Sequence, residues 1–82
     1  MGYIRHTDYL IKVGNRVKQI REEKGLSQHE LSFRIEISRN QIGRIERGEI
    51  NTSLSALYEI ASGLEVSIVE LIKIASDSDS EV

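Results

Sequence analysis

Apolar residues recur every three or four positions along most of this chain, which is the period of one face of an α-helix. The first such series is Leu10, Val13, Val17 and Ile20. It predicts a helix from Asp8 onward, with Thr7 as its N-cap. Gly25 stands where the chain would need a left-handed residue to end that helix.

A serine flanked by apolar residues marks the start of a helix three times. The three copies are Leu26-Ser27-x-x-Glu30-Leu31, Ile37-Ser38-x-x-Gln41-Ile42 and Val66-Ser67-x-x-Glu70-Leu71. In each copy the serine can cap the amide three residues on, while Glu or Gln reaches back to the serine amide. The two apolar residues form a hydrophobic staple that fixes the entry angle. Helices are therefore predicted to start at Ser27, Ser38 and Ser67.

Together with one further start, around Thr52 or Ser53, these starts divide the rest of the chain into four short helices. The second runs from Ser27 to near Ile35, and a turn of about three residues leads to the third, which is the helix-turn-helix layout. The fourth begins around Thr52 or Ser53, and the fifth ends at about Ala75. The apolar residues expected to be buried on the fourth helix are Leu54, Leu57, Ile60, Ala61 and Leu64.

The sequence therefore predicts an all-α fold of five helices in one compact domain. With 82 residues and no cysteine, the chain can form one small core without disulfides. We expect residues 1–75 to form this domain, with residues 1–7 as an N-terminal arm. The acidic segment 76–82, SDSDSEV, has almost nothing to bury and is predicted to be a disordered tail.

The third predicted helix separates its apolar and polar residues onto two faces. With successive residues about 100° apart, Ser38, Ile45 and Glu46 share the inward face of Ile42. The outward stripe is Arg39, Asn40, Gly43, Arg44 and Arg47. A glycine inside a helix costs roughly 1 kcal/mol relative to alanine, so Gly43 indicates that something bulky approaches this stripe. Arg and Asn match the base edges of a major groove about 12 Å wide, which favours sequence reading in DNA over a merely solvated face.

Charge is unevenly distributed along the chain. Residues 1–47 carry ten Lys or Arg and six Asp or Glu, whereas residues 48–82 carry one and seven. The net charge of −2 therefore conceals a basic first half and an acidic second half. A local basic surface matters more for binding a polyanion than the whole-chain charge does, so a nucleic-acid partner remains compatible with the composition.

The fifth predicted helix carries more apolar residues than one face can bury within so small a domain. They are Ile68, Val69, Leu71, Ile72 and Ile74. We interpret the surplus as a two-fold interface, which for a helix-turn-helix places two recognition helices about 34 Å apart. A palindromic DNA site follows from that symmetry. The alternative is that all five residues belong to the core of one chain.

Four segments carry a resemblance to a known family. They are Ile20-Arg21, Lys24-Gly25-Leu26-Ser27-Gln28-x-Glu30-Leu31, Ile42-x-x-Ile45-Glu46-Arg47-Gly48 and Leu54-x-x-Leu57-x-x-Ile60-Ala61-x-x-Leu64-x-Val66-Ser67. They resemble the Cro/lambda-repressor (XRE) type of helix-turn-helix domain. Within that family, the short length and Arg39 at the start of the third helix resemble the controller proteins of restriction–modification systems.

The resemblance implies a sequence-specific transcriptional regulator that binds double-stranded DNA as a homodimer. It implies that the residues facing bases are Arg39, Asn40, Gln41 and Arg44. The residues implied to contact the sugar–phosphate chain are Gln28, Arg47 and, through the backbone around Gly48 to Thr52, Gly48, Asn51 and Thr52. It also implies an ion pair between Arg21 and Glu46 that ties the first helix to the third. The inward position of Glu46 agrees with this pair independently.

Three residues depart from the family pattern, and one of them, Ser32 in place of an alanine, is small enough to be harmless. Glu36 stands in the turn where the family usually has glycine, and Glu65 replaces a glycine common at the end of the fourth helix. A left-handed residue other than glycine is disfavoured by about 1–2 kcal/mol. We therefore expect a slightly different turn around Glu36.

Enzyme chemistry finds little support in the sequence. There is no glycine-rich phosphate loop and no cluster of metal ligands, and His6 and His29 lie in the arm and in a first helical turn. We expect no cofactor and no metal. The competing interpretation is a protein-binding module, such as an antitoxin-like subunit whose acidic half binds a toxin. RNA polymerase is another candidate partner.

Membrane association is not indicated either. No apolar run approaches the roughly 20 residues that span a bilayer. The start of the sequence lacks the charged-then-apolar layout of a signal peptide. We therefore expect a cytoplasmic protein that is nucleoid-associated when bound to DNA.

Overall fold

The computed structural model describes the backbone of residues 4–79 and the side chains of residues 4–73. Within that range the chain forms five α-helices and no strand, which confirms the predicted all-α class. The helices are α1 (Thr7–Glu23), α2 (Gln28–Ser32), α3 (Arg39–Glu46), α4 (Leu54–Leu64) and α5 (Ile68–Asp79).

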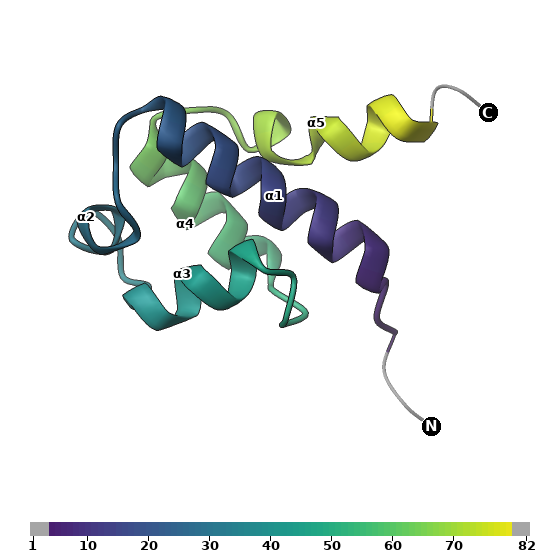
Figure 1. Ribbon diagram of the computed structural model, residues 1–82, viewed down its shortest axis with the longest axis horizontal. Coiled ribbons are helices and arrows are strands. Elements are labelled where there is room, and N and C mark those ends of the chain that lie inside the picture. The colour runs from purple at the N-terminus through teal and green to yellow at the C-terminus, as the bar shows by residue number, and fades with distance from the viewer. Residues whose placement is uncertain (1–3, 80–82) are drawn as a thin grey trace.

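Helix α1 is the central element of the arrangement (Figure 1). It packs against α3 on one side and α5 on the other, with α4 behind it, while the short α2 packs against α3 at one end of the molecule. Every helix contributes at least one fully buried side chain to a single core. These side chains are Val17, Leu31, Ile42, Ile60, Leu64 and Leu71. One apolar core therefore holds α3 against the rest of the domain.

Local capping explains where the middle helices begin. The Ser27 hydroxyl accepts a hydrogen bond from the Glu30 amide at 2.9 Å, and the Glu30 carboxylate accepts one from the Ser27 amide at 2.8 Å. This reciprocal capping box lowers the pKa of Glu30, because the bonded amide favours the charged carboxylate. Ser38 and Ser53 cap α3 and α4 through their hydroxyls, which accept from the Gln41 and Ala56 amides. The Gln41 side chain does not reach back to the Ser38 amide, so the predicted box at Ser38 is half formed. The predicted starts at Ser27 and Ser38 are confirmed.

At Ser67 neither of the two bonds of the expected box is formed. The Ser67 hydroxyl accepts from the amide of Val69, not from that of Glu70. The Glu70 carboxylate instead accepts from Arg16 at 3.2 Å, and the Glu70 carbonyl accepts from the same guanidinium at 2.9 Å. A charged donor on α1 forms the stronger bond, so Glu70 links α5 to α1 and does not cap its own helix.

Two helix boundaries differ from the prediction at the ends of α1 and α2. Thr7 is the first residue of α1 and not its cap, because the Leu10 amide already donates to the His6 carbonyl. Helix α2 ends at Ser32 and not near Ile35. The Ser32 hydroxyl donates to the His29 carbonyl, which is the local competition that makes serine a weak helix former.

Helices α4 and α5 differ from the prediction in one side chain and one boundary. Leu54 was expected to be buried, but it is the first residue of α4 and its side chain is 73% exposed. Helix α5 continues past Ala75 to Asp79, because no glycine or proline follows to end it. The predicted tail therefore begins with helical residues, and residues 80–82 lie outside the described part.

The ends of α1 and α4 both use a left-handed residue. Gly25 has a φ of 75°, as predicted for the residue that ends α1. Glu65 ends α4 with a φ of 61° and is the one residue other than glycine with a positive φ among those described. Glu36 therefore does not carry the left-handed strain that its position suggested, and the strain lies at Glu65.

Replacing Glu65 with glycine should raise the free energy of unfolding by about 0.5–1 kcal/mol. Relief of the left-handed strain, about 1–2 kcal/mol, exceeds the entropy cost of a glycine, about 0.5–1 kcal/mol. Urea denaturation followed by circular dichroism measures the difference. Ser62→Gly, at an exposed site inside α4, should destabilise the protein. If both variants changed the free energy of unfolding in the same direction, the strain at Glu65 would be contradicted.

Candidate nucleic-acid interface

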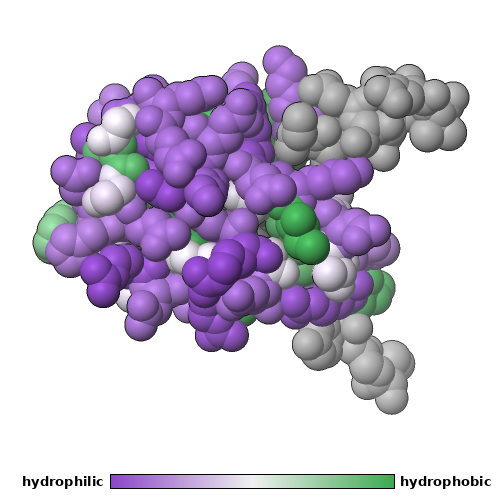
Figure 2. All heavy atoms as spheres, in the orientation of Figure 1, coloured by the Kyte–Doolittle hydropathy of each residue, from purple (hydrophilic) through white to green (hydrophobic). Residues whose placement is uncertain are grey.

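The donor side chains on α3 face away from the core. Ile42 and Ile45 are buried. The exposed residues of this segment are Arg39, Asn40, Gln41, Arg44 and Arg47. In Figure 2 the most hydrophilic colouring of the visible face lies over α3. The outward orientation predicted for these side chains is confirmed, and their roles with DNA stay a prediction.

The ion pair between Arg21 and Glu46 is present and lies inside the protein. The Arg21 Nε donates to Glu46 Oε2 at 2.6 Å and the Arg21 Nη2 donates to Glu46 Oε1 at 3.0 Å. Their exposures are 6% and 3%. The hydrogen bonds from Arg21 to the Glu46 carboxylate raise the pKa of Arg21. This two-pronged bond fixes the last turn of α3 against α1.

Gln28 extends the same network to α2. Its Nε2 donates to Glu46 Oε1 at 2.9 Å, and its side chain is half-buried. An amide nitrogen carries two hydrogens, so this bond leaves a second one for an external acceptor such as a phosphate oxygen. Helices α1, α2 and α3 therefore meet on one carboxylate, which makes the helix-turn-helix a rigid unit.

The outward position expected for Gly43 is wrong, because Gly43 is buried. A Cβ atom at this position would lie 3.1 Å from the Arg47 Nη1 and 3.4 Å from the Gln28 Oε1. The groups that approach Gly43 are therefore the ends of the Arg47 side chain, just past α3, and of the Gln28 side chain on α2, and the helical wheel of α3 alone does not include Gln28. Gly43 makes room for the helix-turn-helix contact itself.

The loop after α3 is held by bonds within the chain. The Gly48 amide donates to the Ile45 carbonyl at 3.0 Å, and the Glu49 amide donates to the Arg44 carbonyl at 2.9 Å. Gly48 is buried against α1, with a φ of 71°. Since its amide is already bonded, the phosphate contact expected for Gly48 is not supported, and the residue instead turns the chain closely past α1.

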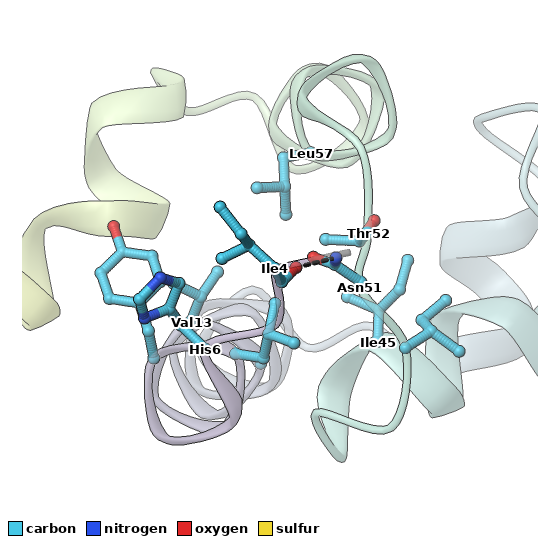
Figure 3. Close-up of a pocket in the computed structure, with 11 residues that line it drawn as sticks. Ile4, His6, Val13, Ile45, Asn51, Thr52 and Leu57 are labelled. Carbon is cyan, nitrogen blue, oxygen red and sulfur yellow. Dashed lines mark hydrogen bonds between the residues drawn. The ribbon is translucent and has the colours of Figure 1, made fainter. Parts of the chain in front are cut away.

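The N-terminal arm lies against this loop. The Arg5 guanidinium donates to the Glu49 carbonyl at 2.8 Å and to the Gly48 carbonyl at 3.3 Å. The side-chain amide of Asn51 donates through Nδ2 to the Ile4 carbonyl at 2.9 Å. Figure 3 shows this bond. Asn51 remains exposed, so its second amide hydrogen can still reach a phosphate. The sequence offered no signal for this docking beyond a lone arginine in the arm.

Thr52 lies on the inner side of the same loop, where it lines a cavity of 310 Å³ between the arm, α1 and α4 (Figure 3). Its hydroxyl is buried and has no hydrogen-bond partner among the described residues. The Thr52 hydroxyl is therefore not placed to contact a phosphate, and the contact expected for the backbone at Thr52 stays a prediction. The arm covers this side of the loop, which the sequence pattern did not reveal.

An acidic residue that the sequence reasoning passed over lies among the donors. The Arg47 Nε donates to Glu49 Oε2 at 2.6 Å, and the Arg44 Nε lies 3.8 Å from Glu49 Oε1. The bond from Arg47 lowers the pKa of Glu49. The presence of an acid two positions after Arg47 was a visible signal for this contact.

The apolar residues of α5 separate into two groups. Leu71 is fully buried in the core of its own chain, so the expected contact of its side chain with a second copy is wrong. Ile68 and Ile72 are half-buried against that core, and Val69 is 57% exposed. The side chain of Ile74 lies outside the described residues. Tyr58 on α4 is a further large exposed side chain, at 64%.

Two other features, a metal site and a membrane-spanning helix, were also considered for the described residues. Within the described part of the chain, no three His, Cys, Asp or Glu side chains are grouped to hold a metal ion. None of the helices that the structure describes is long and apolar enough to cross a membrane.

Comparison with known proteins places these features in a context. The family model HTH_3, described as helix-turn-helix, matches residues 17–71. An uncharacterized HTH-type transcriptional regulator, y4dJ of Sinorhizobium fredii, is 42% identical over 60 residues, which cover 73% of this chain and 78% of that protein.

Two solved structures share both fold and sequence with the chain. One is the restriction-modification controller protein C.AhdI from Aeromonas hydrophila, with a TM-score of 0.78, 38% identity, and coverage of 80% of this chain and 96% of that chain. The other is the tetramer of the controller protein C.Esp1396I in complex with its natural 35 base-pair operator. It has a TM-score of 0.78, 35% identity, and coverage of 88% and 95%.

Proposed function

The chain belongs to the helix-turn-helix family HTH_3, and from that premise we propose that it is a transcriptional regulator that binds double-stranded DNA in a sequence-specific way. The observation that carries the proposal is the exposed row of donors on α3, mounted on a buried bond between Arg21 and Glu46. Rigid mounting matters because base reading requires donors held in a fixed register. The family consists of regulators, and catalysis is not part of the proposal.

We assign the contacts to two classes. The base-reading residues are Arg39, Asn40, Gln41 and Arg44 on α3. Arg47, Gln28 and Asn51 are assigned to phosphates, since each is near the end of α3 or on the adjoining elements and retains hydrogens for an external acceptor. Thr52 is assigned to phosphate through its backbone alone, and Gly48 serves this surface by shaping the loop.

We further propose that the chain acts as a homodimer on a palindromic operator. Val69 on α5 is exposed and apolar, and Ile68 and Ile72 flank it with partly exposed surfaces. The oligomer of C.Esp1396I on its operator supports an assembly of several copies. Two-fold symmetry would place the two α3 helices about 34 Å apart, on successive turns of the major groove.

The likeness to C.AhdI and C.Esp1396I supports a place for this regulator in the control of a restriction–modification operon. We propose that this regulator acts in the cytoplasm, on the operator of such an operon. The antitoxin-like alternative, which is based on the acidic half of the chain, stays a prediction.

Selecting bound sites from random duplexes with the purified protein tests the function. We expect enrichment of one palindrome whose half-sites are about 10 base pairs apart, since two α3 helices must enter the same side of the duplex. The absence of any enriched sequence would overturn sequence-specific binding. An enriched site without two-fold symmetry would overturn the homodimer alone.

Arg39→Ala and Arg47→Ala should weaken DNA binding in different ways. Loss of a base contact at Arg39 should cost about 1–3 kcal/mol on the selected site and relax the preference at one base step. Loss of a phosphate contact at Arg47 should weaken binding to all sequences alike and flatten the salt dependence by about one unit per protomer. Fluorescence anisotropy on selected and random duplexes measures both. If Arg39→Ala weakened both duplexes equally, its assignment to bases would be wrong.

A further inference from the structure

Glu49 places a carboxylate among the arginines of the proposed DNA surface. The Arg47 Nε donates to Glu49 Oε2 at 2.6 Å, the Arg47 Nη2 donates to Glu49 Oε1 at 3.4 Å, and the Arg44 Nε lies 3.8 Å from Oε1. The three side chains are between 46% and 58% exposed. A negative charge therefore lies beside two arginines of a surface proposed to bind a polyanion.

The backbone of Glu49 is fixed on both sides of its side chain. The Glu49 amide donates to the Arg44 carbonyl at 2.9 Å, and the Glu49 carbonyl accepts from Arg5 at 2.8 Å. The side chain therefore starts from one position, within reach of Arg44 and Arg47. Its effective concentration at these guanidinium groups is high because the chain itself holds it there.

A carboxylate and a phosphate present the same kind of acceptor to arginine. The guanidinium group carries parallel N–H donors that match two oxygens of either anion. The two-pronged contact between Arg47 and Glu49 uses the Nε and Nη2 hydrogens that a DNA phosphate would accept. Exposed ion pairs contribute little to stability in water, so a phosphate of a bound duplex can displace the carboxylate.

We propose that Glu49 is an internal competitor for DNA phosphate, which occupies Arg47 in the free protein and must be displaced when a duplex binds. The inference rests on the proposed function and adds a residue that opposes binding. Its effect is greatest where phosphate contacts supply nearly all of the affinity, which is the case for random sequence. Glu49 thus limits the time that the regulator spends on DNA without its operator.

The charge state of Glu49 suits this role. The hydrogen bond from Arg47 holds the pKa of Glu49 below its usual value. The carboxylate therefore stays ionised at neutral pH, where an operator is bound. Competition with phosphate is consequently present throughout the physiological range.

Glu49→Gln is the direct test, because glutamine keeps the size and an oxygen acceptor but removes the charge. We expect the affinity for a random 30-base-pair duplex to rise about fivefold or more per protomer. The plot of log affinity against log salt should become steeper by about one unit per protomer, because no displaced carboxylate takes up a cation to offset the one released from the phosphate. Binding is measured by anisotropy between about 50 and 200 mM salt. The exposed side chain leaves the unfolding midpoint unchanged.

Glu23→Gln is the matched control, because it removes the same charge from an exposed residue at the far end of α1. Ile11 of α1 touches Gly48, next to Glu49, and Glu23 lies roughly 18 Å further along the helix. That distance exceeds the Debye length of about 8–10 Å. The control should therefore change affinity by less than twofold. A second control adds Glu49→Gln to Arg47→Ala. Relative to Arg47→Ala alone, this double variant should show little of the gain in affinity.

The outcomes separate the inference from the function on which it rests. Unchanged affinity and salt slope in Glu49→Gln, with normal binding by the wild-type protein, overturn the inference alone. A fall in affinity would also overturn it and would assign Glu49 to a direct contact with DNA. If Glu23→Gln raised the affinity by the same factor, the effect would come from the net charge of the protein, and the inference would be overturned. Wild-type protein that binds no duplex at all would overturn the proposed function and this inference together.

Discussion

Replacing Glu46 with alanine should lower the free energy of unfolding by about 3–5 kcal/mol, the cost of removing one partner of a buried ion pair. The guanidinium of Arg21 would keep its bond to the Leu26 carbonyl but lose both bonds to the carboxylate. Its charge would then lie in the protein interior without a counter-charge. Gln28 would also lose its acceptor. Urea denaturation followed by circular dichroism measures the loss.

A double variant separates the charge effect from packing. Arg21→Met with Glu46→Leu removes both charges and fills the space with apolar groups, so it should be much more stable than either single variant. If the double variant were as unstable as Glu46→Ala, the cost would come from lost geometry around α3 and not from an unpaired charge. A loss below about 1 kcal/mol in Glu46→Ala would mean that the pair is solvated.

The ion pair between Arg21 and Glu46 should also affect the affinity for DNA when folding is weakened. At low temperature, where part of Glu46→Ala remains folded, the last turn of α3 has lost its link to α1. Specific DNA binding should then fall further than the folded fraction does, because base reading depends on the orientation of α3. The pair therefore contributes to stability and to recognition through one set of bonds.

Features that depend on neighbours a few residues apart could be predicted from the sequence. Ser27 and Ser38 start helices because each serine and its partner are three positions apart. The helical period also placed Glu46 inward and Arg39 outward correctly, since the angle between residues is set within one helix. The pair of Arg21 and Glu46 was implied by the family resemblance, and the structure contains it.

Features that depend on a second element could not be predicted in the same way. Gly43 is covered in part by Gln28 from α2, beside Arg47, and the hydroxyl of Thr52 is buried beneath the arm. Glu70 bonds to Arg16 on α1 in preference to its own helix. Spacing along one helix carries no information about which distant residue arrives at a given position. The errors therefore lie at contacts between elements.

Val69 and Leu71 show the same limit on the proposed dimer surface. Both are apolar residues of α5, and the pattern alone gave them one role. Packing against α1 and α4 buries Leu71 completely and leaves Val69 exposed. An apolar surplus on α5 therefore does not by itself show which residues are available for an interface, because the geometry of the core decides that.

Replacing Gly14 with alanine should destabilise the protein by about 3 kcal/mol or more, the upper range for overpacking a core. Gly14 is the residue of α1 that contacts the end of α3, and it is buried. A Cβ atom there would collide with the Ile45 carbonyl oxygen and would lie 2.6 Å from that of Glu46. Both are backbone atoms of α3, so relief requires the whole helix to move. The gain in helix propensity, about 1 kcal/mol, is too small to compensate.

Gly43→Ala is the matched control for Gly14→Ala, because it adds the same methyl group inside another helix. Its nearest neighbours are the ends of the Arg47 and Gln28 side chains, which can move at little cost. We therefore expect its free energy of unfolding to stay within about 1 kcal/mol of the wild type, and Gly14→Ala to unfold at much lower urea. Comparable stability of the two variants would contradict the close contact of α1 with α3. Since that contact sets the position of α3, any folded Gly14→Ala should also bind the operator more weakly, whereas a simple loss of stability would leave the affinity of the folded fraction unchanged.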